Sequence, residues 1–411
     1  MGARGRWAMA GKAAFILCWC ALLPPVMSGQ SLQGRFFTPK NTYLVGEPIF
    51  VTYELLNTGP QPLWIDGRLD DPCFDQSPIT VENASPARHR WKTALDCGPT
   101  GFGGSCLSSE VEIKPGQTHS GRIYANHYYG LDQPGIYEID IDWNIHMSDG
   151  PIPSFSAETV EVMGNVDIRV VQGTEPELES AFQPVLRDLA SADYEIRGQS
   201  LQAVTEQAQP FLEQTILDLS RNPEDVWPAI EGLYRINTPQ TRSRLADLAE
   251  HSQSEDGIRA QAVQALAATG DTSYLPLLFR LARTLKGYEQ AMAIESAGLL
   301  GGDKAVSFLL NFLRSPDPLV RGAAVRGLAG TASRNAVGPL IQELGDSDAS
   351  VRENASFALT QLTHRSVSQH ALPAEADPAS TFQIWVNWWL TQGRNATVYD
   401  PTECAEPTPL N

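Results

Sequence analysis

The chain has 411 residues, 42% of them hydrophobic and 19% charged, which is enough apolar material for two or three domains of ordinary size. Acidic residues outnumber basic ones by 48 to 30, and the formal net charge is −18. Because phosphate recognition depends on a surplus of Lys and Arg, this balance argues against nucleic acids and anionic membranes as partners.

The first 28 residues have the pattern of a secretory signal peptide. A basic stretch ends at Lys12, an apolar run follows from Ala13 to Leu23, and small residues surround Ser28. The run is too short to span a bilayer, and no later stretch approaches about 20 apolar residues. We therefore expect cleavage after Ser28, with Gln30 as the competing position, and an exported protein that is periplasmic or extracellular. An uncleaved anchor is the alternative.

Residues 29–173 are expected to form an antiparallel β-sandwich. Apolar residues alternate with their neighbours along 49–56, and a strand pattern returns at 136–143. Turn sequences rich in Pro, Gly and Asn stand at 57–60 and 114–117. Short strands of this kind, separated by turns over about 140 residues, are typical of a sandwich.

Four turn sequences of this region carry a family resemblance. They are Val-Gly-Glu-Pro-Ile at 45–49, Asn-Thr-Gly at 57–59, Lys-Pro-Gly-Gln-Thr at 114–118 and Gln-Pro-Gly-Ile-Tyr at 133–137. The pattern resembles bacterial immunoglobulin-like modules, including the BsuPI-type proteinase inhibitors. The resemblance implies an immunoglobulin-like fold and leaves proteinase inhibition open as a function.

Four cysteines remain after removal of the signal: Cys73, Cys97, Cys106 and Cys404. An even number in an exported chain predicts two disulfides. We expect Cys97 to pair with Cys106, because the eight residues between them include four Gly and can close a tight loop. A bridge from Cys73 to either residue is the competing assignment, and the connectivity of Cys404 stays open. Metal binding is less consistent with the spacing.

The segment Asp66–Asp75 concentrates four aspartates, which would suit calcium, but it lacks the spacing of a twelve-residue calcium loop. A solvated acidic loop is the favoured interpretation. No paired histidine motif and no nucleophile elbow is present. We therefore predict no catalytic residues, no cofactor-binding residues, no metal ligands and no cofactor.

Residues 174–365 contain an internal repeat with a period of 31. Its marker is an arginine that has an acidic residue four positions earlier. These pairs are Asp193 with Arg197, Glu255 with Arg259, Asp317 with Arg321 and Asp348 with Arg352. Pro228 and Gln290 occupy the two intervening positions of the series. Agreement at several offsets predicts an α-solenoid of about six two-helix repeats.

The segments 317–324 and 348–355 both read Asp-x-x-Val-Arg-x-x-Ala. This signature resembles the short HEAT repeats of the phycobilisome bilin lyases, and the resemblance covers about residues 190–365. It implies an α-solenoid but no lyase activity, because no matching catalytic feature accompanies it. Asp317 and Asp348 are placed to cap the first helix of their repeats.

The arginine series allows two interpretations. It could bind a phosphate or carboxylate ligand, or it could form a structural ladder of ion pairs between repeats. We favour the ladder, because a carboxylate recurs in step with each arginine and bidentate pairing is the contact that guanidinium groups prefer.

Residues 366–411 are expected to form a polar linker, a helix and a C-terminal tail. Phe382, Trp385, Trp388 and Trp389 share one face of that helix. Because so many exposed indoles would favour aggregation, we expect the helix to cap the last repeat. An aromatic platform for a ligand is the alternative.

These features together predict an exported, non-enzymatic interaction protein whose solenoid binds a protein or peptide partner. The second hypothesis is a proteinase inhibitor that acts through the β-domain, with the loop closed by Cys97 and Cys106 as the inhibitory element. The third is an enzyme with a site between the domains, for which the sequence offers no set of catalytic residues.

Overall fold

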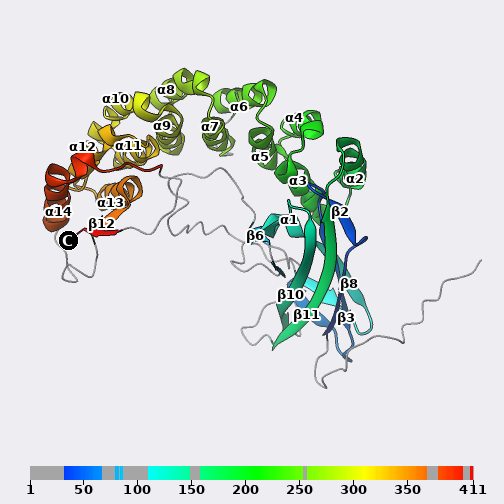
Figure 1. Ribbon diagram of the computed structural model, residues 1–411. Coiled ribbons are helices and arrows are strands. Elements are labelled where there is room, and N and C mark those ends of the chain that lie inside the picture. The colour runs from blue at the N-terminus through cyan, green and yellow to red at the C-terminus, as the bar shows by residue number, and fades with distance from the viewer. Residues whose placement is uncertain are drawn as a thin grey trace, which may run out of the picture.

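The computed structural model describes residues 32–66, 79–82, 84–86, 110–148, 158–252, 257–367, 378–400 and 408–410. Within these residues, a β-rich region is followed by a curved array of helices (Figure 1). The last long strand, β11, spans Glu158–Val171, and the first helix of the array, α2, spans Glu175–Asp188. The change from strands to helices therefore lies beside residue 173.

The β-rich region contains two main sheets. The first has the order β1-β3-β8 and is antiparallel, with β1 at Leu32–Phe37, β3 at Phe50–Asn57 and β8 at Thr118–Tyr124. The second has the order β2-β11-β10-β4-β7, with β5 beside β10. Its other strands are β2 (Thr42–Leu44), β4 (Leu63–Asp66), β5 (Ile79–Val81), β7 (Glu110–Ile113) and β10 (Gly135–Ser148). The antiparallel pairing that the sequence predicts has one exception here, because β2 runs parallel to β11.

Alternation along the strands explains how the two sheets share one core. Tyr53 in β3 is buried, and its ring meets Trp143 of β10 edge-on at 5.0 Å. In β10 the buried series also includes Ile139 and Ile141. Ile136 is instead 66% exposed, because an even-numbered residue of this strand points to the opposite face. The apolar faces of the two sheets therefore pack against each other.

The helices of the array form two rows along an arc (Figure 1). The inner row contains α3 (Tyr194–Gln207), α5 (Val226–Ile236), α7 (Ile258–Ala268), α9 (Gly287–Gly301), α11 (Pro318–Gly330) and α13 (Ala349–Thr363). The outer row contains α4 (Glu213–Leu219), α6 (Pro239–His251), α8 (Leu275–Thr284), α10 (Val306–Leu309), α12 (Arg334–Glu343) and α14 (Pro378–Thr391). The starts of the inner helices run from residue 194 to residue 349 in five steps, a mean spacing of 31 residues.

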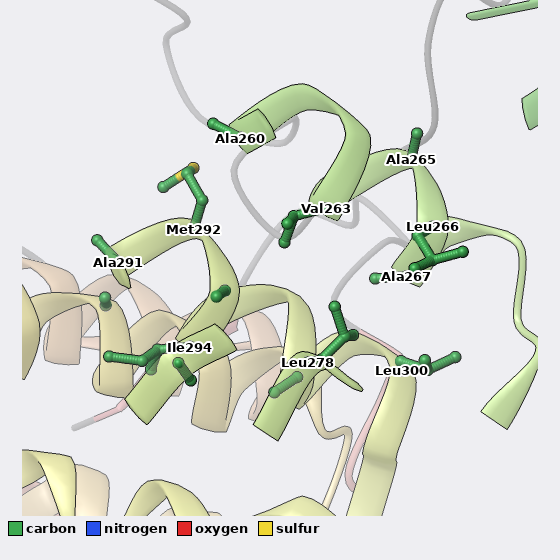
Figure 2. Packing of buried hydrophobic residues seen from close by; sticks show 14 of the residues in the cluster. Ala260, Val263, Ala265, Leu266, Ala267, Leu278, Ala291, Met292, Ile294 and Leu300 are labelled. Atoms are coloured by element: carbon green, nitrogen blue, oxygen red, sulfur yellow. The ribbon is translucent and has the colours of Figure 1, made fainter. Parts of the chain in front are cut away.

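Small residues allow the inner helices to pack closely. Ala262 and Ala293 are fully buried in α7 and α9. Figure 2 shows the same layer, in which Val263, Leu278 and Ile294 lie among other buried side chains of α7, α8 and α9. The closest approach joins α9 to α11, where a Cβ atom on Gly298 would come within 2.0 Å of the Gly327 carbonyl oxygen. Only glycine fits at that crossing.

The C-terminal end of the array is covered by α14 and the segment that follows it. Trp385 is fully buried and Trp388 is 6% exposed, and both belong to the core of the solenoid. The ring of Tyr399 stacks on His364 at 3.8 Å, and its backbone N–H donates to the Leu362 carbonyl oxygen. Strand β13 (Thr408–Leu410) pairs with β12 (Arg365–Val367). The C-terminal segment therefore folds back onto the end of α13.

Candidate interaction surface

The acidic residues of the repeat signature cap helices. The Asp193 carboxylate accepts hydrogen bonds from the Glu195 and Ile196 backbone N–H groups at the start of α3. Asp317 and Asp348 do the same for α11 and α13. The caps predicted for Asp317 and Asp348 are thus confirmed. Glu255 lies outside the described residues.

The arginines of the series form contacts between neighbouring repeats. Three ion pairs join successive inner helices or the loops before them: Arg197 with Asp225 at 2.6 Å, Arg259 with Glu289 at 3.0 Å, and Arg321 with Asp346 at 2.7 Å. The partner is therefore a carboxylate of the following repeat and not the residue four positions earlier, which serves as a cap at Asp193 and Asp317. Arg352 donates to the carbonyl oxygens of Asp346 and Ser347.

The link between Arg321 and Asp346 lies beside a second carboxyl group. Hydrogen bonds from Arg321 lower the pKa of Asp346 to about 2. Burial, together with the negative charge of Asp346, raises the pKa of Glu343 to about 7. The two pKa values shift in opposite directions because the guanidinium hydrogen bonds go to Asp346, whereas desolvation dominates at Glu343.

Arg122 of β8 joins the β-rich region to the first helices of the solenoid. Its guanidinium donates to the Asp188 carboxylate at 2.9 Å, the Gln199 side-chain oxygen at 2.9 Å, the Ser200 hydroxyl at 2.7 Å and the Ile196 carbonyl oxygen at 2.8 Å. The same group lies over the ring of Phe50 at 4.2 Å. With donors directed at four different acceptors, the contact fixes an orientation as well as an attachment.

Other residues of β8 and of the short helix α1 (Ala125–Tyr128) extend this junction. His127 lies 2.9 Å from the Glu206 carboxylate, and the Gln207 amide donates to the Tyr124 hydroxyl at 3.0 Å. Tyr124 also belongs, with Phe50, to the hydrophobic core of the solenoid. The β-rich region therefore covers the first end of the solenoid, as α14 covers the last.

A row of exposed apolar side chains follows one edge of the inner helices. We call Tyr194, Trp227, Tyr288 and Leu319 the apolar ridge; they are 86%, 48%, 55% and 42% exposed. Each is the first or second residue of its helix, in α3, α5, α9 and α11. Four of the seven exposed large hydrophobic side chains in the described part of the chain lie in this row.

The apolar ridge has no exposed large apolar side chain at the start of α7, whose first residue, Ile258, is only partly exposed and follows Gly257. A Cβ atom on Gly257 would lie 3.9 Å from the ring of Trp227. The indole therefore lies beside the start of the third repeat.

At Trp227, a register difference concealed the exposed position from sequence reasoning. The 31-residue alignment places Trp227 at the same position as Val320 and Val351, both of which are buried. In the structure Val226 takes the buried position, at 4% exposure, and Trp227 points outward. Moving the second repeat by one residue would have aligned Val226 with the buried valines, which is the signal that the sequence contained.

Several predicted site residues cannot be located. All four cysteines, including Cys97 and Cys106, lie outside the described residues, as does the segment 67–78 that contains most of the predicted acidic loop. Among the residues that are described, no cluster of three or more His, Cys, Asp or Glu side chains could hold a metal ion. In the same part of the chain, no helix is both long enough and apolar enough to cross a membrane.

Comparison with known proteins identifies the helical region. The sequence profile of HEAT repeats matches residues 209–298 and 306–386. A search of curated proteins finds no match. Among solved structures, the crystal structure of an engineered protein is 22% identical, with a TM-score of 0.29, and the alignment covers 43% of this chain and 94% of that one. The matched segments run from residue 209, shortly before α4, into α14, so the helical region of this chain is built of HEAT repeats.

Proposed function

We propose that the protein is an exported, non-enzymatic scaffold whose HEAT solenoid binds a protein or peptide partner. In this proposal six two-helix repeats begin at residues 194, 226, 258, 287, 318 and 349. An immunoglobulin-like β-domain closes the first end of the array. Export is supported by the basic and apolar pattern of the first 28 residues.

The observation that carries the proposal is a continuous helical surface with exposed apolar side chains in register. Ion pairs between repeats and buried closures at both ends hold this surface in one shape. A solenoid of this kind contributes an extended binding face that no single repeat could supply. Exposed apolar residues that gather at the starts of neighbouring helices are typical of interaction sites, whereas scattered ones are ordinary surface.

Hydrogen exchange of the whole mature chain tests the proposal. A partner would first be isolated with the tagged protein from the exported fraction and then purified and mixed with it at known concentration. We expect slower exchange in peptides of α3 to α13 and unchanged exchange in β10 and β11. Protection confined to the β-rich region, or inhibition of a proteinase in a panel assay, would instead support the inhibitor hypothesis.

A further inference from the structure

The apolar ridge has a geometry that selects one kind of partner segment. We propose that it binds an extended, basic, proline-containing segment in the polyproline II conformation, with an apolar side chain at every third position. This inference depends on the proposed scaffold function, because it names the surface and the chemistry of the partner for that function.

The spacing of the repeats carries the conformational part of the proposal. Successive inner helices are in contact along the array, and packed helices lie about 8–10 Å apart. A polyproline II helix has three residues per turn and rises about 3.1 Å per residue, so equivalent side chains recur about every 9 Å. In a β-strand the side chains of one face recur about every 7 Å, and in an α-helix one turn rises about 5.4 Å. The polyproline II period lies within the usual spacing of packed helices, whereas the β-strand period and a single α-helical turn are shorter than that spacing.

The side chains of the ridge suit such a segment chemically. Polyproline II backbone has no internal hydrogen bonds, so its carbonyl oxygens remain available to donors. The hydroxyl groups of Tyr194 and Tyr288 are donors on apolar rings, and Trp227 adds the apolar surface of its exposed indole ring. Aromatic surfaces of this kind dock proline-rich segments, whose ordering cost is low because the conformation is already populated before binding.

The charges beside the ridge favour basic residues in the partner. Within three positions of a ridge side chain, the exposed acidic residues are Asp193, Glu224 and Asp317, whereas the exposed basic residue is Lys286. Arg197 and Arg321 also fall in this range, but their guanidinium groups are paired with carboxylates of the next repeat. The chain as a whole carries a net charge of −18, which reinforces the attraction of a cationic segment.

The length of the ridge sets the length of the segment. From Tyr194 to Leu319 there are four steps between repeats, or about 32–40 Å at the usual spacing of packed helices. About 10–13 residues in the polyproline II conformation cover this distance. A twelve-residue peptide with the sequence Leu-Pro-Lys repeated four times is therefore a suitable probe.

Titration calorimetry of the mature full-length chain with this peptide tests the inference. Two control peptides separate its parts: Leu-Pro-Glu repeated four times reverses the charge, and Leu-Gly-Lys repeated four times removes the stiffness. We expect the Leu-Pro-Lys peptide to bind at least tenfold more tightly than either control. We also expect the double variant Trp227→Ser with Tyr288→Ser to weaken its binding by at least tenfold.

The matched control variant is Met163→Ser, because Met163 is also an exposed apolar residue, 67% exposed, but lies on β11. Its affinity should stay within twofold of that of the unmodified chain. If the double variant unfolds at a lower temperature than the unmodified chain, Tyr194→Ser replaces it, since that side chain is 86% exposed and its loss leaves the core intact.

Equal binding of the three peptides, equal loss in Met163→Ser, or no binding at all would overturn the inference. The scaffold proposal is judged separately by hydrogen exchange with the isolated partner. If that partner protects inner helices away from the ridge while the peptide does not bind, the scaffold proposal stands and the ridge assignment is wrong. If the partner protects no part of the solenoid, the scaffold proposal itself fails.

Discussion

The two ends of the solenoid are closed by different physical means. At the first end, the hydrogen bonds of Arg122 attach a β-rich region to α2 and α3. At the last end, Trp385 and Trp388 of α14 cover the core with apolar surface. Each closure buries apolar side chains of the terminal helices that would otherwise be exposed. The first closure also sets an angle, because hydrogen bonds are directional and apolar burial is not.

This difference bears on how the chain presents a binding surface. A tryptophan cap stabilises the last repeats but can shift slightly without losing most of its free energy. The Arg122 contact loses several hydrogen bonds at once if the β-rich region rotates, so it holds that region in one position relative to Tyr194, the first residue of the apolar ridge. Substitutions at the two ends should therefore differ in the kind of effect that they have, on stability or on shape, as well as in its magnitude.

The largest loss of stability is expected at the end that the tryptophans of α14 close, which we call the apolar end. Replacement of Trp385, which is fully buried, by Ala should lower the free energy of unfolding by about 3–5 kcal/mol, since it removes a large buried ring and leaves a cavity. Chemical denaturation measures this loss. Leu390→Ala on the same helix is the control, because Leu390 is 57% exposed and its replacement should change stability by less than about 0.5 kcal/mol. Equal effects of the two variants would contradict the buried position of Trp385.

A substitution at the end that Arg122 closes, which we call the polar end, should cause a smaller loss of stability together with a change of shape. Arg122→Ala removes the guanidinium that donates to the Asp188 carboxylate and to the Gln199 side-chain oxygen, and it should cost about 2–3 kcal/mol. Arg122→Lys should recover little, because an ammonium group cannot satisfy four acceptors in this arrangement.

Small-angle scattering distinguishes the two ends. Arg122→Ala should broaden the distribution of interatomic distances, since the β-rich region is no longer held at one angle. Trp385→Ala, measured below its unfolding transition, should leave that distribution unchanged. A broadened distribution for both variants would show that neither end fixes an angle.

The two closures were not equally accessible from the sequence. The tryptophan helix was predictable, because its aromatic residues share one helical face and apolar residues need cover. The role of Arg122 was not predictable, because its acceptors lie 66 to 78 residues further along the chain and no local sequence pattern indicates them. The repeat period and the caps at Asp317 and Asp348 follow from local spacing, which is why they could be predicted. The carboxylate partners of the arginines depend on how repeats stack, so spacing alone selected the wrong acidic residues.

The links between repeats inside the solenoid should resemble the polar end. Arg321→Ala should lower stability by about 2 kcal/mol, because it leaves the Asp346 carboxylate, 8% exposed, without its bidentate partner. Arg352→Ala is the control, since Arg352 donates to backbone carbonyl oxygens and leaves no charge unpaired. Thermal unfolding of both variants measures the difference. Unchanged stability in Arg321→Ala, combined with loss of partner binding, would favour the ligand-binding interpretation of the arginine series.

Glu343, which lies beside the ion pair of Arg321 with Asp346, should make the stability of the chain depend on pH. Its pKa is raised to about 7 in the folded chain from an ordinary value of 4.5, so folding favours the protonated form. The stability associated with protonation is present below about pH 4.5 and is lost as the pH rises through 7. Glu343→Gln should therefore stabilise the protein above pH 7 by about 1–2 kcal/mol, after allowance for solvent screening of a half-buried group, and should have little effect at pH 4.5.

Melting temperatures of the unmodified chain and of Glu343→Gln across pH 4.5 to 8.5 measure this effect. Asp346 gives an opposite trend at lower pH: its pKa is lowered to about 2, so its contribution is present above about pH 4 and is lost as the pH falls toward 2. A constant difference between the two proteins across the whole range would contradict the raised pKa of Glu343.

The smallest expected effect lies at the polar end and is a gain of stability, opposite in sign to the loss expected for Arg122→Ala. Gly198 is in the middle of α3, the helix that receives Arg122, and an added Cβ atom would meet nothing within 4 Å. Gly198→Ala should therefore stabilise the chain by about 0.5–1 kcal/mol through helix propensity alone. Gly298→Ala is the matched contrast, because its Cβ atom would overlap the Gly327 carbonyl oxygen and force α9 and α11 apart. Chemical denaturation should give opposite signs for these two substitutions. A loss of stability in Gly198→Ala would mean that α3 packs more closely at this position than the open space around Gly198 indicates.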